Sequence, residues 1–443
     1  VLRCALSLFL AAMGAVICIV IQNYFMLPVL AEALGQEYSV REGWLSGAFG
    51  RYLEEEDAGL EIGVCFPVPK AEEPFCGELS LGKKEKKVKC YGFREDLDHP
   101  EHYDEGLEPA FARILDDFSP DIVHLFGTEF PHGYACAKMW NRPERTLTGL
   151  QGLCIACADG YMADLPLSVQ NGRTFRDILK RDSLRQQQEK FYARAAQEEK
   201  QLRLSRHITG RTQFDKTISL GLNPSAVYHK MNETMRPQFY EGGWKPESCT
   251  RGEIFLSQGD YPLKGFHYLL QAMKEILQKC PDAQIKTAGN SVLGMNGMKN
   301  KIKIPAYGQY LRRLIKENGL EGKVRVLGKL SAEEMKAEYL SANVFVCPSA
   351  VENSPNSVAE AQLLGVPVAA SRAGGIPDMV EDGVSGLLFE KGDAHGLAGQ
   401  VIRILTDDRL AERLSASEQR AAAAQYDGDA NYRRLLEIYG EML

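Results

Sequence analysis

The sequence has no excess of basic residues, which argues against a protein that grips nucleic acid backbones. Its 443 residues include 52 Lys and Arg against 59 Asp and Glu, a formal net charge of −7. Proteins that bind nucleic acid usually show a basic balance. We therefore expect no nucleic-acid partner.

A paired-cysteine framework is also missing. The 11 cysteines are an odd number at irregular spacing, and Cys18, Cys65 and Cys347 lie in apolar, strand-like runs. Cys154 and Cys157 form one Cys-x-x-Cys pair, without the second pair that would complete a zinc site. The pattern is typical of free thiols in a reducing compartment. We therefore expect a cytoplasmic protein.

A long apolar run occurs at the N-terminus. Residues 1–22 carry Arg3 as their one charge, and such a run is long enough for a signal peptide or a membrane span. Residues 15–21 (AVICIVI) alone are typical of a buried first strand. Two interpretations stay open for residues 1–12. They are an extension upstream of a start at Met13, which we prefer, or a membrane anchor.

What the chain does contain is a regular alternation of short apolar runs and helical patterns, typical of a doubly wound α/β protein. With 44% hydrophobic and 25% charged residues, two domains can each bury a core. We expect strands at residues 15–21, 60–68, 86–91, 121–126, 147–151, 207–210, 253–257, 284–288, 323–327, 344–347, 366–370 and 386–389. We expect helices at residues 44–55, 105–118, 133–140, 174–206, 265–279, 307–318, 332–340, 356–364, 375–381 and from 395 to the end.

The densest motif is SAVENSPNSVAEAQLLG at residues 349–365. An apolar strand ends at Pro348, a polar loop follows, and a helix begins near Pro355 or Asn356. Free N–H groups and the helix dipole make such a helix start a natural phosphate site. Glu352 and Glu360 would be repelled by a diphosphate unless they had another task. Binding the hydroxyls of a sugar or a ribose is such a task.

This segment resembles the signature of the retaining family 4 glycosyltransferases (glycosyl transferases group 1), in which two Glu are separated by seven residues. The resemblance implies that Glu352 contacts the donor sugar and that Glu360 holds the ribose hydroxyls. It also implies that backbone amides near Ser357 and Val358 hold the diphosphate, and Asn356 is expected to bind the donor as well.

A second stretch, SQGDYPLKG at residues 257–265, strengthens the resemblance. Lys264, followed by Gly265, matches the lysine with which the family neutralises the leaving diphosphate. The family commonly has an Arg about six residues earlier, where this chain has Gln258. Arg211 and Arg372 are candidate substitutes for that missing charge.

Further loops resemble parts of the family's donor site more weakly. The turn AGGIP (373–377), with Gly375, resembles its Gly-rich turn, and Gly328 follows a strand where the family's loop borders the base. In REGWLSG (41–47), Gly43 would let the loop after the first strand approach the donor phosphate.

The loop that ends PDIVHLFGTEFPH (120–132) is expected to face the acceptor. Glu129 and His132 lie in this loop, where His132 or a carboxylate could take the acceptor's proton. His124 falls inside the preceding strand, and we expect a structural role for it.

Two patterns are expected to carry no function. Asp427-Gly428-Asp429 resembles the Asp-x-Asp metal motif of the other major glycosyltransferase fold, but it stands between helices, where Asp is a cap. Residues 174–206 form a basic amphipathic pattern that could lie on an anionic membrane, although several acidic residues dilute it. We favour a solvated helix.

The resemblance implies a GT-B fold, in which two Rossmann-like α/β domains face each other across a cleft. We expect an N-terminal acceptor domain at 1–222, a linker at 223–251 that is rich in Pro, Gly and aromatics, and a donor domain at 252–425. Residues 426–443 are expected to form a helix that crosses back to the first domain.

The resemblance also implies transfer of a sugar from a nucleotide diphosphate sugar to an acceptor hydroxyl with retention, in cell-surface polysaccharide or glycolipid synthesis. Lys264, Glu352 and His132 are the expected catalytic residues, with neither metal nor cofactor. The expected acceptor is a carbohydrate or lipid-linked molecule, with peripheral contact at the inner face of the membrane. A GT-B-fold epimerase, a sugar phosphorylase and a non-catalytic binding subunit remain alternatives.

Overall fold

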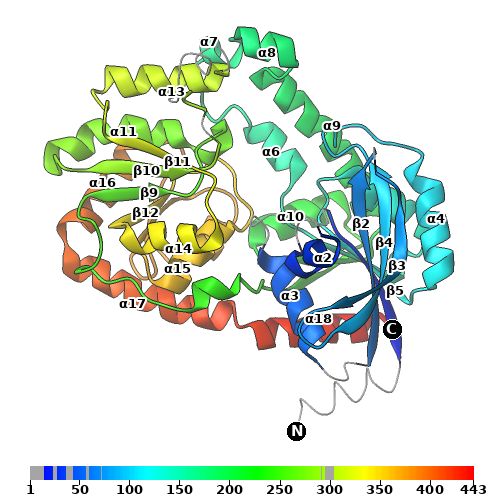
Figure 1. Cartoon of the computed structure of the whole chain (residues 1–443). Coiled ribbons are helices and arrows are strands. Elements are labelled where there is room, and N and C mark those ends of the chain that lie inside the picture. The colour runs from blue at the N-terminus through cyan, green and yellow to red at the C-terminus, as the bar shows by residue number, and fades with distance from the viewer. Residues whose placement is uncertain are drawn as a thin grey trace. The chain divides into compact units, whose positions relative to one another are not determined.

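The computed structural model describes residues 14–22, 27–35, 43–55, 59–70, 72–290, 292–294 and 304–443. They form two compact units, and each unit is built on its own sheet (Figure 1). Unit 1 contains the chain up to Ile155, Phe191–Arg236 and Tyr426–Leu443, and unit 2 contains Ala156–Lys190 and Pro237–Gln425. Two predictions concern residues outside these ranges. They are the interpretation of residues 1–12 and the Arg41–Glu42 part of the loop predicted after the first strand.

The sheet of unit 1 has eight strands in the order β3-β4-β2-β1-β5-β6-β7-β8. Neighbours run parallel except β3 and β4. The strands are β1 Ala15–Val20, β2 Leu60–Pro69, β3 Phe75–Leu81, β4 Lys86–Glu95, β5 Ile122–Phe126, β6 Thr146–Gly149, β7 His207–Gly210 and β8 Val227–Lys230. The helices with residues in this unit are α2 Pro28–Ala33, α3 Gly43–Glu54, α4 Leu107–Phe118, α5 Pro131–Trp140, α6 Cys154–Gly160, α9 Leu184–Arg203, α10 Gln213–Leu222 and α18 Gly428–Met442.

The first strand shows why this sheet is covered on both faces. Side chains alternate along a strand, so Ile17 and Ile19 of β1 enter one core while Cys18 and Val20 enter another. Helices α3 and α18 supply the first core, and helices α4 and α5 supply the second. The predicted strand at residues 15–21 is confirmed as β1.

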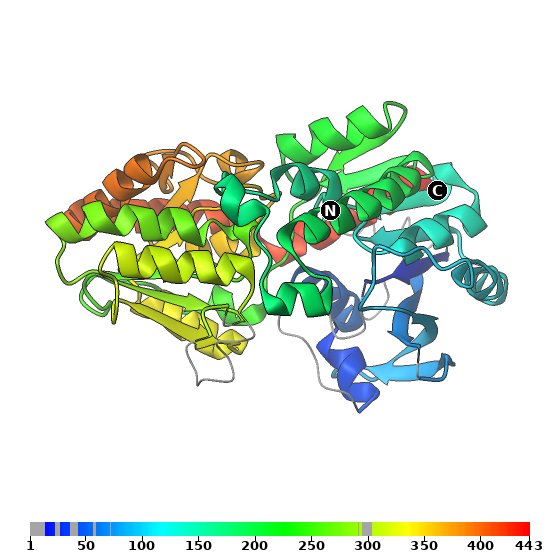
Figure 2. The same ribbon diagram turned by 90° about the horizontal axis from the view of Figure 1, so that it is seen from above.

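The sheet of unit 2 has six parallel strands in the order β11-β10-β9-β12-β13-β14. The strands are β9 Glu253–Leu256, β10 Gln284–Ala288, β11 Val324–Gly328, β12 Val344–Cys347, β13 Val368–Ser371 and β14 Leu387–Phe389. Besides parts of α6 and α9, its helices are α7 Leu167–Gln170, α8 Phe175–Lys180, α11 Phe266–Lys279, α13 Ala306–Glu317, α14 Ala332–Ser341, α15 Asn356–Leu364, α16 Ala394–Thr406 and α17 Asp408–Gln425. Helices α11 and α13 pack side by side (Figures 1 and 2).

The strand order of unit 2 locates a ligand site by topology alone. From β9 the chain builds outward to β10 and β11 on one side, then returns to add β12, β13 and β14 on the other. Such a reversal splays the loops at the carboxyl ends of the two central strands, and ligands of open α/β sheets bind there. The loops after β9 and β12 therefore flank the candidate site of this unit.

The prediction of one helix at residues 174–206 is wrong. The structure has two helices, α8 and α9, because Arg181 adopts a left-handed conformation with φ 51° and ends α8. Thr174 caps α8 through a capping box with Asp177, which fixes where α8 begins.

Four other elements also differ from the prediction. Residues 375–381 contain only the short 3-10 helix η5 Ile376–Asp378, and the helix predicted from residue 395 to the end is three helices, α16, α17 and α18. The polar edge strand β3 was not predicted, and β8 lies inside the predicted linker.

The contacts divide the chain differently from the predicted domain limits. Residues 156–190, expected in the N-terminal domain, pack with unit 2. Tyr426–Leu443, expected to return to the first domain, do pack with unit 1. Within the described part of the chain, no helix is both long and apolar enough to cross a membrane.

Candidate functional site

Lys264 ends the turn that follows β9. It closes the 3-10 helix η4 Pro262–Lys264, and Gly265 with φ 69° then turns the chain into α11. A side chain at residue 265 would collide with the carbonyl group of Pro348, at the end of β12. The glycine therefore lets the loop after β9 press against the loop after β12, which brings Lys264 next to the predicted phosphate loop.

The two predicted catalytic residues of unit 2 meet at this point. Lys264 Nζ donates to Glu352 Oε1 at 2.6 Å, and Ser349 Oγ donates to the same oxygen at 2.8 Å. Both charged side chains are largely enclosed, with 21% of Lys264 and 12% of Glu352 exposed. Burial by itself lowers the pKa of Lys264, but the facing carboxylate of Glu352 outweighs it and raises the pKa well above the usual range. Lys264 is therefore a permanent cation.

The backbone of Glu352 is clamped by the Gly-rich turn after β13. The amide of Gly375 donates to the carbonyl oxygen of Glu352 at 3.0 Å. Gly374 has φ 54°, and a side chain there would collide with the same carbonyl group. Gly375, predicted to bind donor, thus contacts Glu352 through its own main chain.

Helix α15 begins where the motif predicted, at Asn356 after Pro355. The first N–H groups of a helix lack carbonyl partners within it, so Asn356 and Ser357 offer amides at the helix tip. The amide of Val358 donates to the carbonyl of Pro355 at 3.0 Å, so this group is already used within the turn. Glu360 is buried in α15, with 5% of it exposed.

Gly328 lies two strands from β9, at the carboxyl end of β11. It adopts φ 84°, and its carbonyl oxygen accepts from the amide of Gly289 at 2.9 Å. This bond ties the loop after β10 to the loop after β11. Gly328 thus lies at the carboxyl ends of the strands, where we expected it.

The two arginines expected to replace the missing charge at Gln258 are both engaged elsewhere. Arg372 pairs with Asp382 at 2.6 Å and with Glu390 at 3.3 Å. Arg211 belongs to unit 1, where it is buried and pairs with Glu233.

In unit 1, the prediction that His132 lies in a loop is wrong. Pro131 starts helix α5, so His132 is the second helical residue and is buried. Its Nδ1 lies 2.7 Å from Oε2 of buried Glu95, and its ring packs against Phe93 and Phe130. Gly43 is the first residue of α3.

Two carboxylates connect loops of unit 1. One is Glu129, and the other is Glu198, which the sequence analysis did not predict as a site residue. The Glu129 carboxylate accepts from the Gln22 side chain and from the amides of Thr128 and Gly152, at 3.0 and 2.9 Å. Glu198 of α9 accepts from Thr128 Oγ1 at 2.5 Å and from the amide of Cys154 at 3.1 Å. Nothing distinguishes Glu198 from the other charges of its helix in the sequence.

The residues expected to be structural are so. His124 is buried in β5, its Nδ1 lies 2.7 Å from the Tyr439 hydroxyl, and burial lowers its pKa to about 3. Asp427 caps α18 by accepting from the amide of Ala430 at 2.7 Å, and Asp429 pairs with Arg51 at 2.6 Å. The ten cysteines within the described residues form no disulfide.

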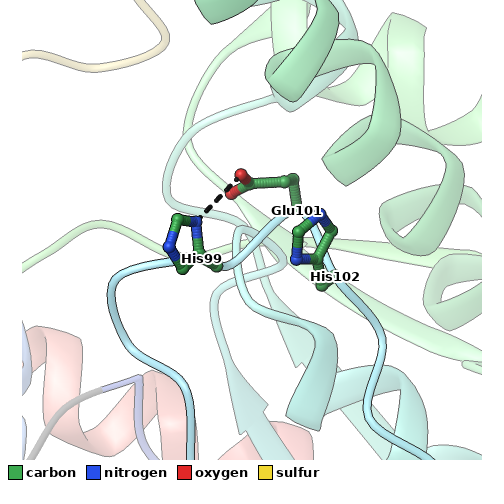
Figure 3. Close-up of side chains that lie close together, drawn as sticks. All are labelled: His99, Glu101 and His102. Carbon is green, nitrogen blue, oxygen red and sulfur yellow. Dashed lines mark hydrogen bonds and ion pairs between the residues drawn. The ribbon is translucent and has the colours of Figure 1, made fainter. Parts of the chain in front are cut away.

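One group of three metal-binding side chains converges among the described residues, and it lies in the loop after β4. The ligand atoms of His99, Glu101 and His102 lie within 4.8 Å of one another, and His99 Nδ1 is 3.3 Å from Glu101 Oε1 (Figure 3). This group belongs to unit 1, whereas Lys264 and Glu352 belong to unit 2.

Comparison with known proteins agrees with this geometry. Residues 246–421 match the model of the family described as "Glycosyl transferases group 1". A D-inositol 3-phosphate glycosyltransferase of Corynebacterium urealyticum is 33% identical over 181 residues, 40% of each chain. The sulfoquinovosyl transferase SQD2 of Arabidopsis thaliana is 30% identical over 166 residues, 37% of this chain and 29% of the relative. The matches thus span about 40% or less of these curated relatives.

Solved structures match over nearly the whole chain. Sucrose-phosphate synthase from Thermosynechococcus elongatus superposes with a TM-score of 0.67 at 16% identity, covering 97% of this chain and 99% of that one. Anabaena HepE in complex with UDP and glucose gives a TM-score of 0.62 at 15% identity, covering 96% and 100%. The chain therefore has the GT-B fold. Within it, residues 246–421 are the part that resembles the glycosyl transferases group 1 family.

Proposed function

We propose that the protein transfers a glycosyl group from a nucleotide diphosphate sugar to an acceptor hydroxyl, with retention at the anomeric carbon. The observation that carries this proposal is the Lys264–Glu352 pair, 2.6 Å apart beside the start of α15 and at the strand reversal of unit 2. A fixed cation and a helix tip suit a diphosphate, while an adjacent carboxylate suits sugar hydroxyls.

In the reaction, negative charge builds on the departing phosphate oxygen. An ammonium group has three donors, so Lys264 can keep Glu352 and still reach that oxygen. The amides of Asn356 and Ser357 would add to this stabilisation, which is held in place before the reaction begins. Glu352 would orient the donor sugar and Glu360 the ribose. Since Lys264 supplies the positive charge, we propose that no metal is required.

The relatives support the substrate class. One of them is named for D-inositol 3-phosphate and one for a sulfoquinovosyl group, and HepE is described in complex with UDP-glucose. We extend from these names to a nucleotide-sugar donor and a carbohydrate or lipid-linked acceptor, in cell-surface polysaccharide or glycolipid synthesis on the cytoplasmic side of the membrane. His132, held by Glu95, is proposed to accept the acceptor's proton.

The proposal predicts a large loss of turnover in Lys264→Ala and Glu352→Ala. Each should lower kcat/KM by roughly 100- to 1,000-fold, because each removes a group aimed at the transition state. Lys286→Ala is the matched control, since Lys286 lies in strand β10 of the same unit and pairs with two carboxylates, Glu253 and Glu338, each at 2.9 Å. The assay measures product formed from a panel of nucleotide sugars and acceptors, with NMR of the product anomer.

Full turnover in correctly folded Lys264→Ala and Glu352→Ala would refute the site, and an inverted anomer would refute retention. Incubation with donor alone, and with donor plus inorganic phosphate, separates an epimerase and a phosphorylase from a transferase. Donor binding without turnover on any acceptor would identify a non-catalytic subunit.

A further inference from the structure

The short helices α7 and α8 carry the most exposed large apolar side chains within the described residues. Of eight such side chains, the four most exposed are Leu167 at 69%, Phe175 at 68%, Ile178 at 63% and Leu179 at 73%. Single exposed apolar residues are ordinary on a protein surface, but a group of them marks an interaction site. We call residues 166–181 the α7–α8 patch.

Helix α8 presents its apolar side outward, which reverses the usual arrangement of a surface helix. Phe175, Ile178 and Leu179 stand at positions i, i+3 and i+4, which share one face of a helix. The polar residues Thr174 and Asp177 are buried instead, with 8% and 1% exposed. The apolar side chains are therefore displayed by the fold itself.

The patch is fixed to the body of unit 2. Asp177 Oδ2 accepts from the amide of Thr174 at 3.0 Å and from the amide of Ala306, at the start of α13, also at 3.0 Å. The segment just before the patch is held as well, because the Tyr268 hydroxyl donates to Asp164 at 2.7 Å. The outward side chains are thus presented on a supported surface.

Basic residues flank the apolar group along the chain. Arg173, Lys180 and Arg181 are exposed, and none of the three forms an ion pair with the residues that the structure describes. Arg176 is different, because it pairs with Asp177 and with Asp182. The patch holds four basic residues and one acidic residue, a charge of +3, in a chain whose formal net charge is −7.

Exposed apolar side chains next to unpaired cations favour one kind of partner, an anionic lipid surface. A bilayer that contains anionic lipid offers phosphate groups to unpaired cations and an acyl region to Phe, Leu and Ile side chains at the same boundary. We propose that the α7–α8 patch docks the protein on an anionic lipid surface, with Leu167, Phe175, Ile178 and Leu179 inserted and Arg173, Lys180 and Arg181 among the headgroups. The proposal does not depend on glycosyl transfer.

The test is co-sedimentation of the full chain with vesicles of phosphatidylcholine alone and of phosphatidylcholine with phosphatidylglycerol. The protein should bind the anionic vesicles and release as salt is raised. The variants Arg173→Gln/Lys180→Gln/Arg181→Gln and Phe175→Ser/Ile178→Ser/Leu179→Ser should each weaken binding on the order of 10- to 100-fold. Thermal unfolding checks that both variants are folded.

Two controls test whether the apolar N-terminus or the total charge of the protein, and not the α7–α8 patch, causes vesicle binding. All variants share the same N-terminus, and Arg409→Gln/Arg413→Gln/Arg420→Gln removes three exposed arginines of α17, so it should bind like the wild type. Equal binding of all variants, or no preference for anionic vesicles, would overturn the proposal. Self-association that the apolar variant abolishes, seen by sedimentation without lipid, would overturn it in favour of a contact between copies.

Discussion

Glu198 shows how one buried carboxyl can organise a whole edge of unit 1. Its oxygens accept from Thr128 after β5 and from the amides of Cys154 and Ile155 at the start of α6. Burial raises the pKa of this carboxyl to about 7, against the lowering effect of the bonds from Thr128 and Cys154. The loops that carry the proposed acceptor side are therefore held by a group that titrates near neutral pH.

This raised pKa predicts a pH-dependent stability. Below the ordinary value of about 4.5 both states are protonated, and no penalty applies. As the pH rises to about 7, the unfolded state ionises while the folded state stays neutral, so stability falls by about 3 kcal/mol and then levels off. In Glu198→Gln this fall should be absent. The free energy of unfolding of both proteins at pH 4.5 and pH 8, by urea titration, measures the difference.

Glu199→Gln is the control for that measurement. Glu199 is the next residue of α9, but its side chain is 44% exposed and pairs with Arg203 at 2.7 Å. Such solvent-exposed pairs contribute little. If Glu199→Gln and Glu198→Gln change the pH dependence equally, the assignment to Glu198 is wrong.

At this scale, sequence patterns locate side chains better than they describe their surroundings. Lys264 and Glu352 were predicted to act together, and they lie 2.6 Å apart although 88 positions separate them. His132 was misplaced because the helix that begins at Pro131 takes it inside. Glu198 could not be predicted, because its burial comes from packing against Thr128, a residue 70 positions away.

Among the elements, the loops after β12 and β13 determine the geometry of the site. Gly374, with φ 54°, lets its turn approach the carbonyl group of Glu352, and the amide of Gly375 then bonds to that group. Glu352 thus connects the glycine turn after β13 to the loop between β12 and α15.

We therefore predict that Gly374→Ala weakens binding of the nucleotide-sugar donor by roughly tenfold or more, because the added methyl group must displace Glu352, the proposed contact of the donor sugar. Gly383→Ala is matched to it, since Gly383 also has a positive φ, 77°, but has open space around it. Both substitutions should cost about 1 kcal/mol or more of stability from backbone strain. Only Gly374→Ala should lose binding, as followed by ligand-induced thermal shift, and equal affinity in the two variants would contradict the clamp.

Most strands and helices of unit 2 follow from hydrophobic pattern, because four of its strands, β9, β12, β13 and β14, are buried along their whole length. Strand β3 escaped prediction because its exposed and partly buried residues alternate at a sheet edge, without an apolar run. The break between α8 and α9 depends on the left-handed conformation of Arg181. The sequence gives no signal for this break, because no glycine or proline stands there.

For the whole molecule, the end of the chain completes the core of unit 1. Tyr432, Leu435, Leu436, Ile438, Tyr439 and Met442 of α18 are buried in the core that also holds β1 and α3. At about 1.5–3 kcal/mol for each large apolar side chain, their burial is comparable with the whole stability of a domain.

Removal of residues 426–443 should therefore unfold unit 1 and leave unit 2 folded. Hydrogen exchange should show loss of protection in β1 and β5 and retained protection in β9 and β12. Arg433→Ala/Glu437→Ala, which changes the exposed side of α18 alone, should behave like the wild type. Simultaneous loss of both units on truncation would show that they fold as one body.

Composition and alternation predicted two α/β domains, which the fold confirms. The placement of residues 156–190 with unit 2 could not be predicted, because it depends on long-range bonds such as that of Tyr268 to Asp164, 104 positions away. Local patterns contain no information on such contacts.

The most direct test of the account is calorimetric titration of UDP, GDP, ADP and TDP into the wild type and into Lys264→Met, with Lys286→Met as the control. The account predicts that at least one nucleoside diphosphate binds the wild type and the control equally, and binds Lys264→Met roughly tenfold or more weakly, because a charged partner of the diphosphate is lost. Binding of equal strength in Lys264→Met, or no binding of any nucleoside diphosphate to the wild type, would contradict it.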